Sequence, residues 1–444
     1  MTIEQRQLSL IRKVKSFFKK NEEKDFDISS SGISYFCSFS ECTGFAFLKL
    51  WDNNLKNFIK FTKIIVKEIL SISNLKNYKF YFEKNIKSDF DKIIVTWGSH
   101  KNFLKDGSYF DSYFRTKSED IKNSIWFIIY LDQELPEIIP KNIVILKRDY
   151  SRIFYNPFFF IKIFIKNLIK SKFSIKYFFY SMSWHSQFSV IVNKHFKKLL
   201  NHKVKNIIMP YESQTFQNVI IKEAKKFNPK IISTGYIHSF PSLPTHFIYN
   251  KLSPNNLILN SKDQMNCFEK NLNWHTAKLK YLPSSRFSKD SSFDMKNYIF
   301  LPIDFISKNK IVFLFEKLIN SSTEYDFSEL KIRNHPHKIN SKKHQQLSKD
   351  LHELIKKNNH DKNRKKLTNH SVFVGATGSI VEALEKGISV FHLCEDPVFE
   401  SYHGKLWPSI EVREIRENIL IYNLSKKGNL IKFGDNKVFE NLYL

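Results

Sequence analysis

The sequence predicts an α/β protein in which two doubly wound parallel sheets face each other across a cleft. Short apolar runs rich in β-branched and aromatic residues alternate with longer helical patterns, which is typical of parallel sheets covered on both faces. A polar, serine-rich stretch at 284–297 separates two such series. The length of 444 residues also fits two or three domains.

The two series predict strands and helices in order along the chain. The first series predicts strands at 33–39, 92–97, 124–130, 143–147, 206–209, 230–237 and 256–259. The second predicts strands at 298–302, 329–333, 371–375 and 388–393, with helices at 309–320, 342–358 and 378–387. We therefore place one domain at 1–283 and the other at 284–444. Ligands in such sheets bind beyond the carboxyl ends of the strands, so the residues after each strand are the candidates for function.

Charge and cysteine content restrict the class of protein. The chain carries 71 Lys and Arg against 43 Asp and Glu, a formal net charge of +28. Abundant Phe, Lys, Asn and Ile indicate an AT-rich genome, so this total alone does not establish an anionic partner. Four cysteines are too few for a disulfide framework and predict reduced thiols in the cytosol. The N-terminus reads as an amphipathic segment rather than a signal peptide, and no run reaches the ~18 apolar residues of a membrane span.

One segment has an unusual charge distribution. Residues 150–211 hold 11 Lys or Arg and no Asp or Glu. Within them, Lys162, Lys166 and Lys170 recur at i, i+4 spacing among phenylalanines and isoleucines. This pattern predicts a helix with a cationic stripe in an insertion at 150–205, which is either a core helix with a solvated lysine edge or a helix on an anionic membrane surface. No nucleic-acid-binding motif is present, so we expect no nucleic-acid partner.

The clearest candidate site lies between the last two predicted strands, where a small-residue turn holds Thr377, Gly378 and Ser379. Free N–H groups at a helix start favour an anion, Gly378 lets a phosphate approach the backbone, and the two hydroxyls add donors. The alternative is a plain N-cap at Thr377 or Ser379, with Glu382 closing a capping box three residues after Ser379. The turn has neither a Walker A nor a GxGxxG pattern, so a P-loop or a dinucleotide site is not expected.

A second candidate follows the strand that ends at Arg333, where His335-Pro336-His337 emerges. Pro336 restricts the backbone of His335 and stiffens the turn. An imidazole held there can donate to a phosphate or to a leaving-group oxygen, although a purely structural histidine is the alternative. Seven of the fifteen histidines lie between 335 and 392, but no carboxylate completes a ligand set near this turn, so no metal is expected.

Candidate bases follow consecutive strands of the first series. Glu212 lies in the turn after one strand and His238 follows the next, so parallel pairing would bring both to one sheet edge. A carboxylate beside an imidazole can raise the pKa of the imidazole and fix its tautomer, which makes His238 the base and Glu212 its orienter. The opposite assignment stays open, as does a structural role for Glu212 at the helix start. Asp106 and Asp111 are weaker candidates in a loop.

A strand ending in His-Pro, followed by a strand–turn–helix with Thr and Ser and a Glu-Ala-Leu helix, resembles bacterial surface-carbohydrate glycosyltransferases of the GT-B fold. Capsule Kdo transferases and bacterial sialyltransferases are similar in these motifs, and the resemblance covers roughly residues 206–410. It implies two Rossmann-like domains. It also implies a site for the CMP part of a CMP-activated keto-sugar, made by Arg333, His335, Pro336, Thr377, Gly378, Ser379 and Glu382. The acidic pair that precedes Gly in sialyltransferases has only Lys105-Asp106-Gly107 as a counterpart.

The sequence therefore predicts a glycosyltransferase of cell-surface polysaccharide biosynthesis, of the inverting type. The resemblance implies a nucleotide-sugar donor in the C-terminal domain and a glycan or lipid-linked acceptor in the N-terminal domain. No cofactor is expected, because basic groups and a helix dipole can stabilise the leaving phosphate. Two alternatives stay open, a CDP-polyol phosphotransferase of the same fold and a non-catalytic scaffold in polysaccharide assembly. The expected location is the cytoplasm, extending to the inner face of the cell membrane if the basic segment binds lipid.

Overall fold

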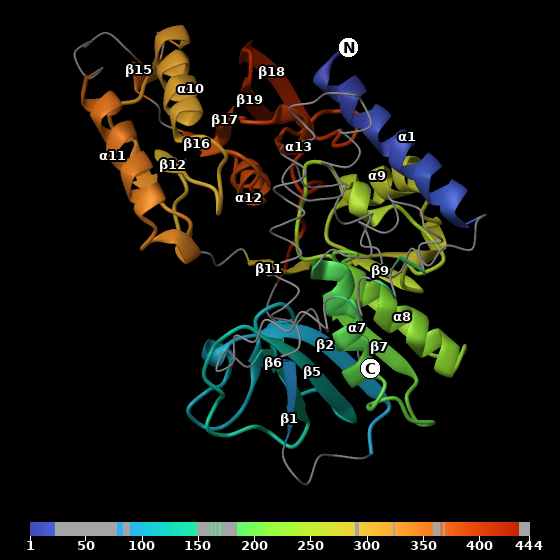
Figure 1. Ribbon diagram of the computed structural model, residues 1–444. Coiled ribbons are helices and arrows are strands. Elements are labelled where there is room, and N and C mark those ends of the chain that lie inside the picture. The colour runs from blue at the N-terminus through green and yellow to red at the C-terminus, as the bar shows by residue number, and fades with distance from the viewer. Residues whose placement is uncertain are drawn as a thin grey trace.

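Two large sheets organise the protein (Figure 1). The computed structural model describes residues 1–22, 78–82, 89–148, 184–288, 293–322, 325–357, 365–366 and 369–434, together with 161, 165, 168 and 169. The predicted strand at 33–39 and the predicted lysine stripe at 162, 166 and 170 lie outside these residues. None of the helices in the described ranges is long and apolar enough to cross a membrane.

The first sheet contains eight strands in the order β1-β6-β5-β2-β7-β8-β9-β10. Their bounds are Tyr78–Phe82 (β1), Lys92–Gly98 (β2), Ser124–Tyr130 (β5), Ile143–Arg148 (β6), Asn206–Pro210 (β7), Ile232–Tyr236 (β8), Asn256–Leu259 (β9) and Leu279–Tyr281 (β10). Strand β1 is antiparallel to β6, and the remaining neighbours are parallel. The helices that accompany this sheet are α1 (Ile3–Glu22), α7 (Trp184–Phe196), α8 (Thr215–Phe227) and α9 (Lys262–Leu272). Of these, α7 and α8 pack against each other.

This order places a crevice between β2 and β7. Numbered by chain position, the parallel strands run 3-2-1-4-5-6, the order of Rossmann-type sheets, with β10 added at the edge. After β2 the chain continues to β5 on one side of the crevice, and after β7 it continues to β8 on the other side. The two connections therefore diverge at the carboxyl ends of β2 and β7. Ligands in open α/β sheets bind at this point. The turn that carries Glu212 begins there, directly after β7.

The second sheet has the order β14-β12-β16-β17-β19-β18. Its strands are Tyr298–Phe300 (β12), Lys331–Arg333 (β14), His370–Val374 (β16), Ser389–Leu393 (β17), Ile410–Arg416 (β18) and Ile419–Leu424 (β19). The first four are parallel and the last two form an antiparallel hairpin that pairs with β17. The associated helices are α10 (Lys308–Ser321), α11 (Lys342–Lys357), α12 (Ser379–Glu385) and α13 (Pro397–Glu400). The divergence point of this sheet lies between β12 and β16.

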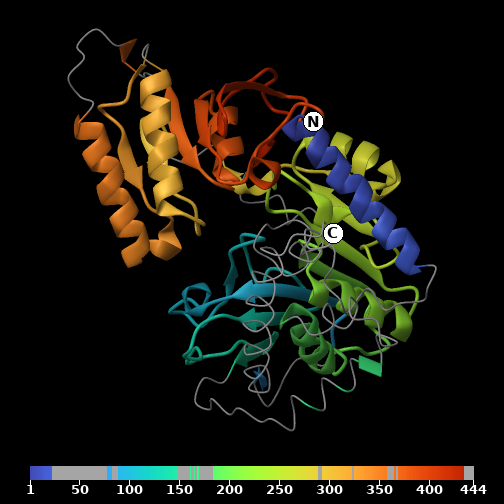
Figure 2. The same cartoon turned by 45° about the horizontal axis from the view of Figure 1, so that its top comes forward.

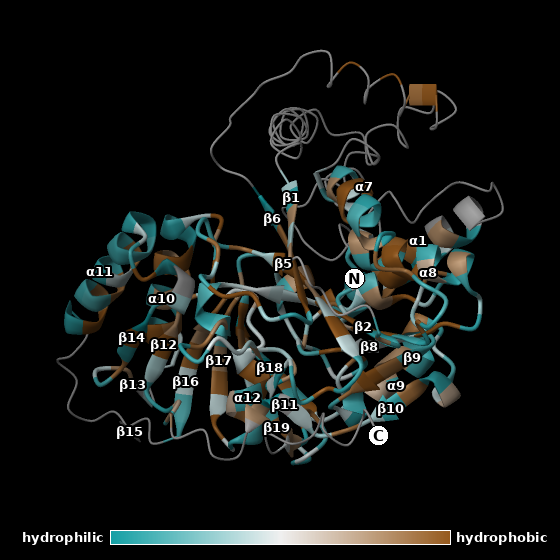
Figure 3. Ribbon diagram, turned by 90° about the horizontal axis from the view of Figure 1, so that it is seen from below, coloured by the Kyte–Doolittle hydropathy of each residue, from teal (hydrophilic) through white to brown (hydrophobic). Residues whose placement is uncertain are grey.

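Short strand pairs complete the described structure. They are β3 (Phe110–Asp111) with β4 (Thr116–Lys117), β13 (Tyr325–Asp326) with β15 (Lys365–Lys366), and β11 (Ser284–Ser288) with β20 (Phe433–Gly434). The last pair joins the start of the predicted second domain to the end of the described chain. Burial follows the predicted pattern, since every residue of β5 is buried. The central strands are largely hydrophobic, whereas the outer helix α11 is mostly hydrophilic (Figure 3).

One hydrophobic cluster spans both sheets. It includes Met209 and Leu257 from the first sheet, Val390 from the second sheet and Leu384 from α12, while two further clusters are each confined to one sheet. Helix α1 lies along the helices of the first sheet, and its N-terminal end reaches the C-terminal part of the chain (Figure 2). There the buried Gln7 donates through Nε2 to the carbonyl oxygens of two residues at α13. The N-terminal amphipathic segment is thus a helix that contacts both parts of the chain.

Candidate active site

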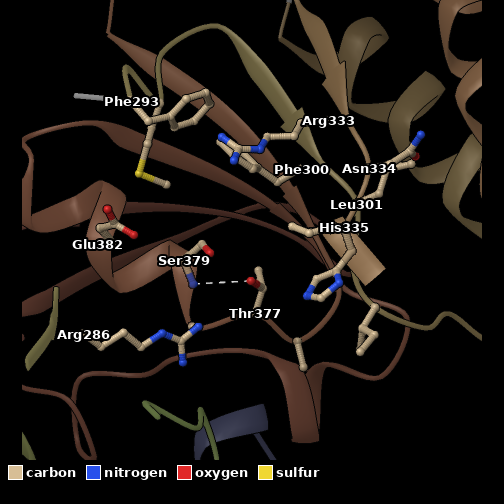
Figure 4. Close-up of a pocket in the computed structure, with 15 residues that line it drawn as sticks. Arg286, Phe293, Phe300, Leu301, Arg333, Asn334, His335, Thr377, Ser379 and Glu382 are labelled. Carbon is tan, nitrogen blue, oxygen red and sulfur yellow. Dashed lines mark hydrogen bonds between the residues drawn. The ribbon is translucent and has the colours of Figure 1, made fainter. Parts of the chain in front are cut away.

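A cavity of about 450 Å³ opens at the divergence point of the second sheet (Figure 4). Its walls come mainly from residues at and after the ends of β12, β14 and β16, with Arg286 from β11 and two residues that precede β12. Every residue that the sequence assigns to nucleotide binding lines this cavity, namely Arg333, His335, Pro336, Thr377, Gly378, Ser379 and Glu382. Segments more than 30 residues apart in sequence therefore meet here because parallel strands end at the same sheet edge.

The turn after β16 is shaped by backbone geometry and one buried histidine. Gly375 has φ of +65°, a left-handed conformation that glycine adopts without strain. The His392 Nε2 donates to the Gly375 carbonyl oxygen at 2.8 Å. Burial lowers the pKa of His392 to about 4, so its imidazole is neutral at physiological pH. A neutral, fully buried side chain thus fixes the start of the turn.

The predicted capping box at this turn does not form. Gly378 is the N-cap of α12 and supplies no side-chain cap, while the Ser379 N–H donates to Thr377 Oγ1 at 3.3 Å. Glu382 instead forms an ion pair with Lys386 at 2.9 Å, one helical turn further on. The capping alternative was wrong because Gly378 is the N-cap, one residue before Ser379, so Glu382 lies one position beyond the N3 site of a capping box.

Two arginines face the cavity from different sides. The Arg333 guanidinium lies 3.7 Å from the centre of the Phe293 ring and 5.9 Å from that of Phe300, in cation–π contact. Arg286 comes from β11 and donates through Nη1 to the His238 carbonyl oxygen at 3.4 Å. The sequence did not single out Arg286 or Phe293, because both lie in the serine-rich stretch that reads as a linker. The one feature of the sequence that could have indicated Arg286 is its position between the two predicted sheets.

A second cavity of about 460 Å³ continues from the first and shares part of its wall, including Arg286, Thr377 and Gly378. It lies between the sheets. Glu212 reaches it from the first sheet, and Glu400 reaches it from α13 of the second. A ligand that spans both cavities would therefore contact both parts of the chain.

Glu212 is held by three polar neighbours. Its Oε1 lies 3.3 Å from His238 Nε2, its Oε2 accepts from Gln214 Nε2 at 2.8 Å, and its backbone N–H donates to Gln217 Oε1 at 3.0 Å. Burial alone would raise the pKa of Glu212, but the hydrogen bonds and charge of His238 and the bond from Gln214 outweigh it and lower the pKa to about 2. Glu212 is therefore ionised throughout the physiological range.

His238 lies behind Glu212 rather than on the cavity wall. Its side chain is 11% exposed and does not line either cavity among the residues the structure describes. The ring packs edge-on against Tyr113 at 4.6 Å between centroids. Its Nδ1 is buried and has no hydrogen-bond partner within the described part of the chain. The structure thus brings Glu212 and His238 together, as parallel pairing predicted, with Glu212 nearer the cavity.

The two loop carboxylates lie elsewhere. Asp106 is 58% exposed, accepts from the Ser108 backbone and hydroxyl, and does not line either cavity in the described structure. Asp111 is fully buried and accepts from Thr96 Oγ1 and from the backbone N–H of Tyr113. Asp111 therefore fixes the loop that packs against His238. Within the described ranges, no group of three or more His, Cys, Asp or Glu side chains is arranged to hold a metal ion.

Comparison with known proteins gives little similarity. No protein-family model matches the sequence, and no curated protein matches it. Among solved structures, the chain is similar to a crystal structure of a glycosyltransferase from Rickettsia africae ESF-5, with 9% sequence identity and a TM-score of 0.30. The match covers 71% of this chain and 81% of that one. A TM-score of 0.30 does not establish a common fold, so the cavities themselves carry the functional interpretation.

Proposed function

We propose that the protein is a glycosyltransferase of cell-surface polysaccharide synthesis, with a GT-B arrangement of a 1–283 acceptor domain and a 284–444 donor domain. One observation carries the proposal. Two continuous cavities lie at the sheet edges where α/β proteins bind ligands, one lined by arginine, histidine and hydroxyl side chains that can donate to a phosphate and one with a carboxylate opposite them. Group transfer from a nucleotide to a hydroxyl needs this combination.

The first cavity suits a nucleotide-sugar donor, and we assign it the CMP-activated acidic keto-sugar that the motifs imply. Arg333 and His335 supply donors for the phosphate, and Thr377 and Ser379 add hydroxyls. Arg286 lines both cavities, so its charge lies at the junction where the bond to the phosphate breaks. It can stabilise the leaving phosphate or pair with the carboxylate of the sugar.

The second cavity suits the acceptor. An acceptor hydroxyl oxygen attacks the anomeric carbon, the bond from that carbon to the phosphate oxygen breaks, and its electron pair leaves on the CMP. The hydroxyl proton passes to a base as the new bond forms. Glu212 lines this cavity and is ionised, so we assign it as the base, with His238 as the positioning residue behind it. Attack from the face opposite the leaving group inverts the anomeric centre.

We further propose that the basic segment contacts an anionic membrane surface, which would hold a lipid-linked acceptor near the cleft. Ile161, Ile165 and Ile169 recur at helical spacing and are between 50% and 61% exposed. A lysine follows each of them in the sequence. Exposed apolar residues beside cationic residues are typical of helices that lie in a membrane interface.

A ligand screen tests the donor assignment. CMP, CDP, UDP, GDP and ADP are compared by thermal shift, and release of CMP from a CMP-sugar is then measured against turnover of CDP-glycerol. A ligand at about 100 times its Kd should stabilise the fold by roughly 2.7 kcal/mol. Turnover of CDP-glycerol alone would indicate a polyol phosphotransferase, and absence of binding by every nucleotide would indicate a scaffold.

Two substitutions test the site itself. Ser379→Ala and His335→Ala should each weaken CMP binding by about 1–3 kcal/mol, because each removes a hydrogen bond to a charged group. His352→Ala is the matched control, since His352 lies exposed on α11 and bonds only to a backbone carbonyl among described groups. Unchanged CMP affinity in both cavity variants, with intact folding, would refute the phosphate site.

A further inference from the structure

The second cavity has an aromatic lining with carboxylates set into it. Phe240, Phe287, Phe305, Phe399 and Tyr402 line it. The negative faces of aromatic rings attract the C–H groups on the flat faces of sugar rings. Carboxylates reach the cavity from both sheets, whereas Arg286 is the one Lys or Arg side chain among the described residues of its wall. The lining therefore combines sugar-packing surfaces with an excess of negative groups.

Two ionisable groups of the wall add little net charge. Asp304 forms an ion pair with Lys338 at 3.1 Å, and its side chain is 67% exposed. His246 is almost fully buried, and burial lowers its pKa to about 4 although the charge of Glu212 opposes the shift. His246 is thus neutral at physiological pH. The charge of the cavity is set by other residues.

Three carboxylates set that charge at a pH above about 7, the value to which burial raises the pKa of Glu400. Glu212 is ionised, and the Glu395 carboxylate accepts the backbone N–H groups of Ile306 at 2.8 Å and Ser307 at 2.6 Å. Glu400 accepts the backbone N–H of Glu395 at 2.7 Å. Backbone amides donate to Glu395 and Glu400, whereas the side chains of His238 and Gln214 contact the oxygens of Glu212. Lys310 binds the main-chain carbonyl of Glu395 rather than its carboxylate.

The pKa of Glu400 reflects its burial first and the neighbouring carboxylates second. Its side chain is 8% exposed, and burial raises its pKa to about 7, with the charges of Glu395 and Asp396 adding to the rise. Another anion placed in this cavity would meet the same repulsion and the same loss of water. The first cavity has the opposite character, because Arg333 and Arg286 line it and its Glu382 is already paired with Lys386.

We propose that the second cavity selects an acceptor whose terminal sugars are uncharged, and that its carboxylates exclude glycan ends bearing carboxylate, sulfate or phosphate. This inference rests on the proposed function, because it assigns the substrate class of the acceptor site. The charged part of the donor occupies the first cavity. The two cavities thereby separate an anionic donor from a neutral acceptor within a chain of net charge +28.

Isothermal titration with two matched trisaccharides tests the inference at pH 8, where Glu400 is ionised. Methyl-esterified trigalacturonate is neutral, and trigalacturonate, which differs from it only in its free carboxylates, is anionic. We expect the neutral sugar to bind at least about tenfold more tightly. Glu400→Gln, or Glu212→Gln if the first variant fails to fold, should reduce that ratio at least about threefold by removing one negative charge. Glu411→Gln, on the exposed face of β18, is the control and should leave the ratio unchanged.

The result is separable from the donor assignment, because CMP binding is measured in the same samples. Loss of CMP binding with the neutral sugar still preferred would refute the donor assignment and support the charge selection. Equal affinities for both trisaccharides, or no binding of either, would overturn the inference whatever the CMP result.

Discussion

At the scale of single residues, Glu212 is distinguished by its partners. His238 and Gln214 bond its two oxygens while it faces the second cavity. If it is the base, Glu212→Gln should lower turnover about 10²–10⁴-fold and leave CMP affinity nearly intact. His238→Ala should raise the pKa of Glu212 and move the acidic limb of the pH–rate profile upward, which loss of a merely structural histidine would not do.

The exposed Asp106 provides the control for this assignment. Asp106→Asn should retain nearly full turnover, because its carboxylate serves only its own loop and Lys117 among described residues. Full activity of both Glu212→Gln and His238→Ala, together with an inactive Asp106→Asn, would transfer the role of base to Asp106.

Glu400 predicts a pH dependence of stability. Its pKa is raised from 4.5 to about 7 in the folded protein, chiefly by burial. Its contribution is therefore fully present below pH 4.5 and is lost as the pH rises through 7. The loss amounts to about 3 kcal/mol for a shift of this size. Urea unfolding at pH 5 and pH 8 should show that Glu400→Gln loses less stability over this interval than the unmodified protein. Parallel pH profiles for the two proteins would contradict the assignment.

At the scale of elements, the pairing of β7 with β8 sets the position of Glu212. Gly235 in β8 lies so close to Tyr211 that an added Cβ would be 2.7 Å from the Tyr211 Cβ. Gly235→Ala should therefore displace Tyr211 and with it the neighbouring Glu212, at a cost of about 1–3 kcal/mol in stability and with reduced turnover. Gly404→Ala is the control, because the nearest atom there is 3.7 Å away. Equal thermal stability and activity of the two variants would refute this role of Gly235.

Element positions were predictable where apolar runs were long and bounded by polar turns. Strands β2, β5, β6, β7, β9 and β17 lie within about a residue or two of the predicted ranges. Strand β10 and the β18–β19 hairpin were not predicted. The residues of β18 alternate charged with apolar types, so it lacks the continuous run that marks a buried strand. A one-residue uncertainty in the helix start was enough to place the alternative cap at Ser379, whereas the N-cap is Gly378.

The candidate site was predictable only in part, for a related reason. Strand ends can be located in a sequence, so the residues after β14 and β16 were assigned to one cavity before their contacts were known. How deeply a side chain is buried cannot be predicted in this way. His238 follows its strand as expected, yet it packs behind Glu212. Glu395 and Glu400 reach the second cavity through packing between the sheets, which no local pattern reports.

At the scale of the whole molecule, the two sheets are joined by hydrogen bonds as well as by the hydrophobic cluster that spans both. Trp407 Nε1 donates to the Ser242 carbonyl oxygen at 2.9 Å, and Tyr402 donates to that of Phe240 at 2.8 Å. These donors are buried and come from the part of the chain that follows α13. Because the second cavity lies between the same segments, its shape depends on this contact. The separate domains expected at 1–283 and 284–444 are therefore proposed as parts of one cooperative unit.

Asp263 tests that cooperativity. It lies on α9, is 4% exposed, and accepts the backbone N–H of Ser409 at 2.8 Å and its hydroxyl at 3.0 Å. Asp263→Ala leaves both donors without this acceptor and should lower the free energy of unfolding by about 1–3 kcal/mol. The control Glu411→Ala, on the exposed face of β18, should change it by no more than about 0.5 kcal/mol. Because one hydrophobic cluster spans both sheets, calorimetry should show one transition for each protein, with that of Asp263→Ala moved as a whole to lower temperature. Two transitions in the unmodified protein, only one of them sensitive to Asp263→Ala, would show instead that the sheets unfold independently.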